Sequence, residues 1–240
     1  MRRIKITLAY DGGPFHGWQV QPGLPTIQGL LEEILTGMEG SPVHVAGSGR
    51  TDAGVHALEQ VAAFTLVNPI PLVNLRRAVN RLLPAAVRVL SVEEAAADFH
   101  PRFQAKAKTY EYRIYRGEVC SPFEWPYVHH YPYRLDEERM AELARSFQGE
   151  HDFTAFAAAD DRDAEGKSKV RMVFSSELCR SGERLTYRVR GSGFLKHMVR
   201  NLVGTLIEAG KGNLAQLGRL PEKSGPTAPA KGLFLVNVEY

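Results

Sequence analysis

The chain has 240 residues, of which 44% are hydrophobic, with 30 Lys and Arg against 27 Asp and Glu and a formal net charge of +3. This composition provides for one large core or two modest ones and excludes a disordered chain. Cys120 and Cys179 cannot build a disulfide framework, and the eight dispersed histidines lack a ligand spacing, so we expect no metal and a reducing compartment. No apolar run approaches the roughly 20 residues that cross a bilayer, which favours a cytoplasmic protein.

The first hundred residues alternate between strand and helix patterns. Ile4, Ile6 and Leu8 lie on one face of a predicted strand over 3–10. Thr26 precedes apolar residues at helical spacing that stop at Gly37 and Gly40. Further along come a short strand over 43–46, a strand over 60–66, a helix over 72–83 and a strand over 87–92. This order is β-α-β-β-α-β.

Residues 49–57, with the sequence GRTDAGVHA, are too polar and too small for a core element. Gly54 follows Asp52 by two positions, and glycine permits backbone conformations that are closed to other residues, so the carboxylate can be presented on a loop. Arg50 is placed to hold that carboxylate ionised, which is the form that nucleophilic catalysis at a sugar carbon requires. The alternative is a plain turn, because aspartate in such a setting is a common turn former.

Cations and aromatic rings alternate in two later stretches. Residues 99–116 hold five cations and one acid, and residues 186–200 hold four cations and no acid. The cations are Arg102, Lys106, Lys108, Arg113, Arg116, Arg188, Arg190, Lys196 and Arg200. The rings among them are Phe103, Tyr110, Tyr112, Tyr187 and Phe194. Cations that neutralise phosphates beside rings that stack on unpaired bases are typical of RNA binding, whereas the alternative is the solvated face of ordinary strands.

A similar order of elements recurs after the start of the first cation-rich stretch, near residue 106. A strand is expected over 108–115, a helix capped by Asp136 and ended by Gly149, paired strands over 170–178 and 185–189, a helix over 197–209 and a strand over 233–238. The charged stretch 160–167 is expected to be a mobile surface loop. The repetition predicts two related halves, 1–105 and 106–240, which face each other across a cleft.

The segment GRTDAGVHA resembles the active-site motif of the TruA family of tRNA pseudouridine synthases. Further blocks follow in the family's order: YDGGPFHGWQVQP at 10–22, TIQ at 26–28, FHPRF at 99–103, KTYEYR at 108–113, HDF at 151–153, FLKHMVRN at 194–201 and APAKGL at 228–233. One departure is KVR at 169–171, where the family pattern has TVR.

The resemblance implies an α+β pseudouridine synthase fold, in which two ferredoxin-like β-α-β-β-α-β halves form a central cleft. It also implies an isomerase that converts uridine to pseudouridine at positions 38, 39 and 40 in the anticodon stem-loop of tRNA. Neither a metal nor a cofactor is required. Members of the family work as homodimers, so a homodimer is expected here.

The site residues follow from the same resemblance. Asp52 is the catalytic carboxylate, and Tyr110 stacks on the flipped uracil, the alternative for Tyr110 being a strand tyrosine packed on the core. Arg200 pairs with Asp52 across the cleft, Arg50 occupies the space that the uridine vacates, and Leu233 forms an apolar wall.

Two histidines receive structural roles. We expect His56 to order the motif loop rather than to act as an acid or base, and His151 to support the fold although it lies in a family block.

Two other functions remain open on the residues alone. A non-catalytic RNA-binding protein of ferredoxin-like architecture would keep the basic clusters without needing Asp52. A glycosidase or nucleosidase would need a second carboxylate near Asp52, and it would not need a basic surface.

Overall fold

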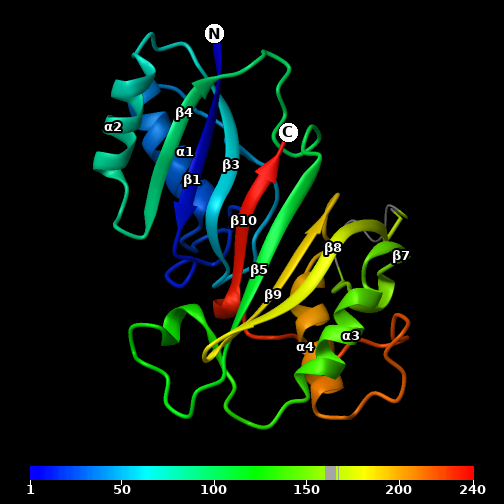
Figure 1. The fold of residues 1–240 in the computed structure, drawn as a ribbon. Helices are drawn as coiled ribbons and strands as arrows, with labels where there is room; N and C mark the ends of the chain where they lie inside the picture. The colour runs from blue at the N-terminus through cyan, green and yellow to red at the C-terminus, as the bar shows by residue number, and fades with distance from the viewer. Residues whose placement is uncertain (160–165, 167) are drawn as a thin grey trace. The chain divides into compact units, whose positions relative to one another are not determined.

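The computed structural model describes residues 1–159, 166 and 168–240, and the chain divides into two compact units (Figure 1). Unit 1 comprises Met1–Lys106 and Phe234–Tyr240, and unit 2 comprises Ala107–Leu233. The stretch 160–167, for which a mobile loop was expected, lies outside the described residues except for Gly166.

Unit 1 is built on a sheet with the strand order β4-β1-β3-β10, and β2 also pairs with β3. These strands are β1 (Arg2–Tyr10), β2 (Ala46–Gly47), β3 (His56–Leu66), β4 (Val87–Glu94) and β10 (Leu233–Glu239). Pairing is antiparallel except between β10 and β3, which run parallel. Ile4, Ile6 and Leu8 are buried on one face of β1, as their alternation predicts.

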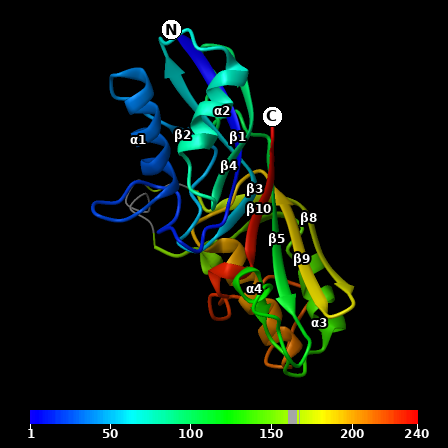
Figure 2. The same ribbon diagram turned by 90° about the vertical axis from the view of Figure 1, so that its left-hand side faces the viewer.

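Two helices, α1 (Ile27–Glu39) and α2 (Leu72–Leu82), lie on the same side of this sheet (Figure 2). Thr26 caps α1 by accepting a hydrogen bond from the Gly29 amide at 3.2 Å. Gly40 ends the helix in the left-handed conformation, with φ of 75°, and the helix runs through Gly37 rather than stopping there.

The short strand expected over 43–46 is reduced to Ala46–Gly47. The backbone of Val45 is satisfied by side chains of α1 instead of by a neighbouring strand. Its amide donates to Glu32 Oε1 at 2.9 Å, and its carbonyl accepts from Gln28 Nε2 at 3.1 Å. A segment bonded to a helix in this way has no free groups for a ladder.

Unit 2 has an antiparallel sheet with the order β5-β9-β8-β7. The strands are β5 (Ala107–Tyr115), β7 (Gly149–Asp152), β8 (Val170–Ser181) and β9 (Arg184–Gly191). The two-residue strand β6 (His129–His130) pairs in parallel with β5. The sequence did not predict β6 or β7.

The helices α3 (Glu137–Ser146) and α4 (Met198–Gly210) of unit 2 pack against each other (Figure 1). Asp136 caps α3 as expected, accepting from the Arg139 amide at 3.1 Å, but the helix ends at Ser146, before Gly149. Short 3-10 helices η1 (Trp125–Tyr127), η2 (Thr154–Phe156) and η4 (Ala230–Gly232) complete the unit. No helix within the described residues is both long and apolar enough to span a bilayer.

The predicted α+β class is confirmed, and unit 1 shows the order β1-α1-β2-β3-α2-β4. The last strand is grouped differently from the expected division into 1–105 and 106–240. Residues 234–240 belong to unit 1, because Phe234 pairs with His56 of β3 and the Lys106 amide donates to the Glu239 carbonyl at 2.8 Å.

Candidate active site

The motif loop, residues 48–55, connects β2 to β3 in unit 1. Asp52 opens a tight turn in which the Val55 amide donates to the Asp52 carbonyl at 3.1 Å. Gly54, the third residue of the turn, has φ of 77°, a left-handed conformation that glycine adopts without strain. Thr51 and Val55 are buried, whereas Asp52 is partly exposed and Ala53 is exposed, so the turn itself faces solvent while its two ends are held in the core.

The segment that follows β1 forms a cradle for this loop. The Trp18 amide donates to the Thr51 carbonyl at 3.0 Å. A Cβ on Gly12 would lie 2.0 Å from the Val55 carbonyl oxygen, and one on Gly17, whose φ is 86°, would lie 2.6 Å from the Thr51 carbonyl oxygen. Only glycine at these two positions allows the two backbones to approach so closely.

Buried polar side chains hold the loop from below. Tyr10 and Thr51 share a hydrogen bond of 2.9 Å between their hydroxyls. Gln60 Nε2 donates to the Gly49 carbonyl at 3.1 Å, and the Ser48 hydroxyl donates to Gln60 Oε1 at 2.5 Å. Burial raises the pKa of Tyr10 to about 12, so its hydroxyl keeps its proton at neutral pH.

Ser48 and Gln60 were missed by the sequence analysis. The signal that could have found them is their position: one polar residue lies on each side of the motif, where the flanking strands are expected to enter the core. Because buried polar groups need partners, such residues are candidates for fixing a loop.

His56 lies at the start of β3 and is buried. Its Nδ1 is 3.1 Å from the Gly12 amide and 3.1 Å from Asp11 Oδ1, and it can accept from the former or donate to the latter. The ring stacks on Phe234 with centroids 4.6 Å apart. These contacts join the cradle, β3 and β10, which supports the loop-ordering role expected for His56.

Unit 2 contains the other candidate residues, beginning with Tyr110 on β5. The Tyr110 ring is largely buried and meets Phe194 edge to face, with centroids 5.1 Å apart and planes at 81°. The structure therefore brings together two of the sequence blocks, 108–113 and 194–201.

Arg200 lies in the first turn of α4 and is tied to the segment 225–229. Its Nε donates to the Ala228 carbonyl at 2.8 Å, and the Ala228 amide donates to the Arg200 carbonyl at 3.1 Å. A Cβ on Gly204 would lie 1.7 Å from the Pro226 carbonyl oxygen, so glycine permits this close approach. Leu233, just beyond this segment, is buried.

Asn201, next to Arg200, links three segments of unit 2. It donates to the Phe156 carbonyl at 2.8 Å and accepts from the Thr227 hydroxyl at 2.6 Å. His197, which precedes α4, has φ of 61° and is the one non-glycine residue with positive φ in the described part of the chain. This left-handed residue sets the direction in which the first turn of α4 leaves the preceding loop.

The predicted site residues thus fall on both units. Arg50, which is exposed, and Asp52 belong to unit 1, whereas Tyr110, Arg200 and Leu233 belong to unit 2. The roles of Asp52, Tyr110, Arg50 and Leu233 and the pairing of Arg200 with Asp52 stay predictions. Within the described ranges, no three His, Cys, Asp or Glu side chains are grouped to hold a metal ion.

Two of the rings expected to stack on RNA bases are not available for it, and that prediction is wrong. Tyr112 and Tyr187 are fully buried, because they lie on the faces of β5 and β9 that meet the core of unit 2. Tyr110, two residues before Tyr112, lies on the same face of β5 and is 8% exposed. Tyr112 donates its hydroxyl to the Pro229 carbonyl at 2.8 Å, and Tyr187 shares a hydrogen bond with Ser176 at 2.8 Å.

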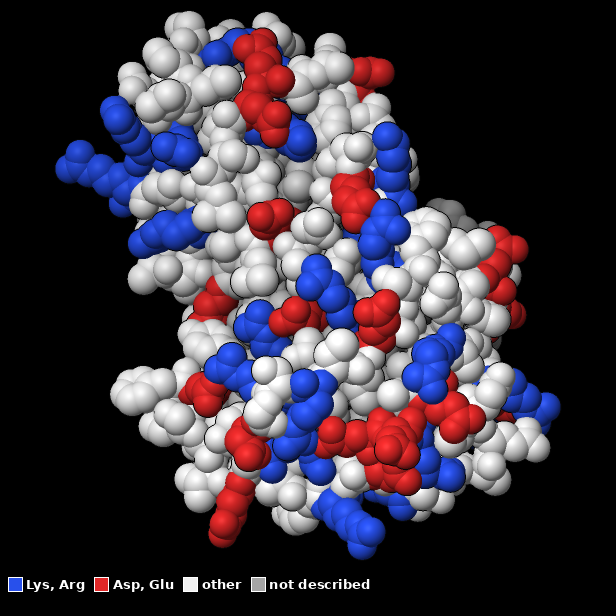
Figure 3. All heavy atoms as spheres, in the orientation of Figure 1, with Lys and Arg blue, Asp and Glu red and all other residues white. Residues whose placement is uncertain are grey.

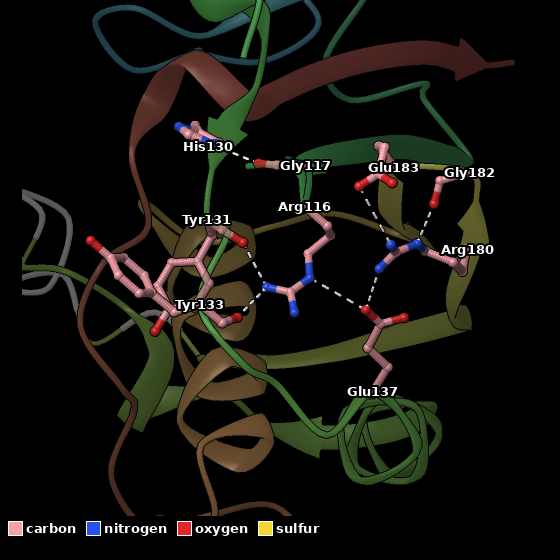
Figure 4. Close-up of polar contacts among 9 residues, drawn as sticks. All are labelled: Arg116, Gly117, His130, Tyr131, Tyr133, Glu137, Arg180, Gly182 and Glu183. Atoms are coloured by element: carbon pink, nitrogen blue, oxygen red, sulfur yellow. Dashed lines mark hydrogen bonds and ion pairs between the residues drawn. The ribbon is translucent and has the colours of Figure 1, made fainter. Parts of the chain in front are cut away.

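Arg116 is likewise committed to the fold (Figure 4). Its side chain, only 8% exposed, donates to the Tyr131 and Tyr133 carbonyls at 2.6 and 2.7 Å and lies 3.3 Å from Glu137. Glu137 also pairs with Arg180. Arg116 therefore pins the connection between β5 and α3 and contributes little cationic surface.

The exposed cations of the two basic stretches are Arg102, Lys106, Arg188 and Lys196. On the face of unit 2 seen in Figure 3, positive and negative side chains are interspersed. The ion pair between Arg113 and Glu111 at 2.7 Å is one example of this mixing. This face thus offers local cationic positions rather than a field of one sign.

Comparison with known proteins adds direct evidence. The family model described as tRNA pseudouridine synthase matches residues 6–104 and 143–240. A protein of Solibacter usitatus named tRNA pseudouridine synthase A is 78% identical over 240 residues and covers 100% of both chains. Proteins of the same name from Geotalea uraniireducens and Lacticaseibacillus casei are 45% and 42% identical, again over 100% of both chains.

Among solved structures, an archaeal box H/ACA sRNP Nop10-Cbf5 complex aligns with 97% of this chain and 46% of that chain, with a TM-score of 0.38 and 12% identity. That likeness is too distant to inform the site. The full-length matches to named relatives, together with the motif loop held in its cradle, show that the chain belongs to the tRNA pseudouridine synthase family and is an isomerase.

Proposed function

We propose that this enzyme converts uridine to pseudouridine at positions 38, 39 and 40 in the anticodon stem-loop of tRNA, with Asp52 as the catalytic carboxylate. The observation that carries the proposal is the motif loop. Its backbone is fixed by Gly12, Gly17 and the buried Tyr10–Thr51 pair, while Asp52 alone is turned toward solvent among Thr51, Asp52 and Val55. A rigid loop with one presented carboxylate suits catalysis at a bound substrate.

The reaction breaks the bond between N1 of uracil and C1′ of ribose, turns the base and forms a bond between C5 and C1′. The C5 proton is lost and N1 gains a proton, so no net change in composition occurs. The target base must first leave its stack, which costs a few kcal/mol.

Two routes use the same carboxylate. Asp52 adds to the ribosyl or base carbon as a nucleophile, or it takes a proton from the sugar to give a glycal-like intermediate. Both routes require an ionised, positioned carboxylate and neither uses a metal or an organic cofactor.

Three residues of unit 2 and Arg50 of unit 1 act around this step in the proposal. Tyr110 stacks on the flipped uracil and assists proton transfer at C5, and Leu233 supplies an apolar wall. Arg200 pairs with Asp52, and Arg50 occupies the space that the uridine leaves. The hydrogen bond from Arg200 Nε to the Ala228 carbonyl supports the role of Arg200, because it fixes the direction of the side chain.

The anticodon arm of tRNA as substrate, a homodimeric assembly and a cytoplasmic location complete the proposal. Full-length identity to relatives named tRNA pseudouridine synthase A supports the choice of tRNA. The cationic positions Arg102, Arg188 and Lys196 are exposed and suited to phosphates.

The test is release of tritium from tRNA labelled at uracil C5, with no metal or nucleotide added. The parent is expected to release tritium, and Asp52→Asn at least a thousandfold less, because the amide cannot act as nucleophile or base. Asp98→Asn, an exposed carboxylate of unit 1, is the matched control and should keep full activity.

Substrates in which cytidine replaces uridine at 38, 39 or 40 should each lose the corresponding label. If neither the parent nor Asp52→Asn releases tritium while both bind tRNA, either the enzyme acts on a different RNA or the chain is a non-catalytic RNA-binding protein. If Asp52→Asn keeps its activity, another residue is the catalytic carboxylate.

A further inference from the structure

Phe103 exposes an aromatic ring on the surface of unit 1. The residue is 75% exposed, whereas phenylalanine is among the residue types most often fully buried. Its neighbours in residues 99–106 include two cations, Arg102 and Lys106, and no acid. An exposed ring beside cations matches the chemistry of an unpaired nucleobase and its phosphate.

The Phe103 ring is held in place rather than free. The His100 ring lies with its centroid 4.3 Å from that of Phe103, and the Arg102 guanidinium lies 5.6 Å from the Phe103 centroid. The Arg102 amide donates to His100 Nδ1 at 3.2 Å, and the Gln104 amide donates to the His100 carbonyl at 3.2 Å. A ring that is already ordered loses little entropy when a base stacks on it.

The supporting backbone is also anchored to the sheet. Tyr240 at the end of the chain donates its hydroxyl to the Pro101 carbonyl at 2.7 Å, and Arg3 Nε donates to the Phe99 carbonyl at 3.0 Å. Lys5 of β1 lies over both the Phe99 and Tyr240 rings, at 5.6 and 5.1 Å from their centroids. The whole segment is therefore a fixed part of unit 1.

Phe123 of unit 2 provides the contrast. It is even more exposed, at 87%, yet it has no ring or cation contact among the described residues. Exposure alone therefore does not distinguish Phe103, whereas its support by His100 and Arg102 does.

The contacts made by the two ends of β10 separate the segment of Phe103 from the motif loop. Phe234, at the start of β10, pairs with His56, which follows the motif loop directly. Tyr240, which holds Pro101, is six residues further on, and six residues of strand span about 20 Å. A base stacked on Phe103 thus belongs to a nucleotide other than the one that reacts at Asp52.

We propose that His100, Arg102 and Phe103 form a stacking platform for an unpaired base of the RNA substrate, outside the nucleotide that is isomerised. The platform rests on the proposed function for its substrate, and it adds a second point of contact that holds the RNA in register. Arg102 contributes its charge to a nearby phosphate and Phe103 contributes the stacking surface.

The test compares Phe103→Ala, Phe103→Trp and the matched control Phe123→Ala in binding unmodified tRNA and in steady-state tritium release. Phe103→Ala should weaken binding and raise KM by about tenfold with kcat within twofold of the parent, and Phe103→Trp should restore both. Phe123→Ala should match the parent. Arg102→Gln should also reduce by about one the magnitude of the slope of the logarithm of the association constant for tRNA against the logarithm of the salt concentration. Phe103→Ala should leave that slope unchanged.

Equal tRNA affinity for Phe103→Ala and the parent would overturn the platform, as would a fall in kcat without a rise in KM. These outcomes leave the proposed function intact, provided that the parent releases tritium. Absence of release by the parent would instead overturn the proposed function, and the binding comparison would still decide whether the platform exists. Thermal unfolding of each variant checks that the exposed substitutions leave the fold unchanged.

Discussion

The loop around Asp52 in unit 1 and the segment 225–229 in unit 2 are both irregular, yet each is fixed by contact between two backbones. Gly12 admits the Val55 carbonyl in the first, and Gly204 admits the Pro226 carbonyl in the second. The difference lies in what is tied down. In unit 1 the loop backbone is held while the Asp52 side chain is partly exposed, whereas in unit 2 the Arg200 guanidinium itself is bonded to Ala228.

This difference indicates how each region is sensitive to substitution. The orientation of a carboxylate on a loop depends on how rigidly the loop backbone is held. Substitutions in the cradle should therefore lower catalysis although they do not touch the substrate. An arginine on a helix already has a rigid backbone, so the orientation of its guanidinium depends on the hydrogen bond that the side chain itself makes. The variants below separate these two modes.

Gly12→Ala should have the largest effect. The added Cβ would lie 2.0 Å from the Val55 carbonyl oxygen, a contact between backbones that no side-chain rotation can relieve. We expect tritium release to fall at least a thousandfold and the free energy of unfolding to fall by roughly 2–4 kcal/mol. Single-turnover release and urea unfolding measure the two effects.

Gly37→Ala is the control for Gly12→Ala. A Cβ on Gly37, inside α1, meets nothing within 4 Å, so this variant should keep full activity and gain roughly 0.5–1 kcal/mol in the free energy of unfolding. Full activity of Gly12→Ala would show that the cradle does not aim Asp52.

Arg200→Ala should act next most strongly, and on chemistry more than on binding. We expect kcat to fall about a hundredfold and the Kd for tRNA to change less than threefold, because the proposed partner of Arg200 is Asp52 rather than a phosphate. Arg200→Lys should recover only part of the loss, since an ammonium cannot both bond Ala228 and present a fork of donors. Single-turnover kinetics and filter binding separate the two quantities.

Arg188→Ala serves as the comparison, because Arg188 is an exposed cation of the same unit. That variant should weaken tRNA binding severalfold and leave the single-turnover rate at saturation unchanged. Comparable losses of binding and rate in Arg200→Ala would contradict its pairing with Asp52 and make it another phosphate contact.

Local patterns predicted the regular elements well where a local interaction sets the boundary. Thr26 and Gly40 bound α1 as their capping chemistry predicts, and Asp136 begins α3. The strand over 43–46 failed because Val45 bonds to side chains 13 and 17 residues away. A contact of this kind leaves no mark on the strand's own alternation.

The candidate site divides in the same way. The motif around Asp52 was identified from its residues, but its buried supports Ser48 and Gln60 were not, because an isolated polar residue in a strand pattern does not reveal its partner. Tyr112 and Tyr187 were expected to stack on bases but are buried, since alternation shows that a strand has two faces without showing which one meets the core. The grouping of β10 with unit 1 depends on parallel pairing with β3, which is not a local feature.

The smallest effect concerns His129, which packs edge to face against Tyr112 in unit 2, with centroids 6.2 Å apart. Its Nδ1 is buried without a hydrogen-bond partner among the described residues. Burial, followed by the charge of Lys231, lowers the pKa of His129 to about 4. Because the unfolded chain takes up this proton near pH 6.5 and the folded chain only near pH 4, His129 should reduce the free energy of unfolding as the pH falls between these values.

His129→Phe keeps a ring against Tyr112 and removes the titration. The full shift would correspond to about 3 kcal/mol, and with the side chain only partly buried we expect roughly 1–2 kcal/mol. Urea unfolding at pH 7.0, 5.5 and 4.5 should show the variant gaining this much on the parent toward low pH. Carboxylates that titrate in the same range act equally on both proteins, so the difference between the two curves isolates His129. A difference that stays constant from pH 7.0 to 4.5 would mean that His129 is protonated as easily in the folded chain as in the unfolded one.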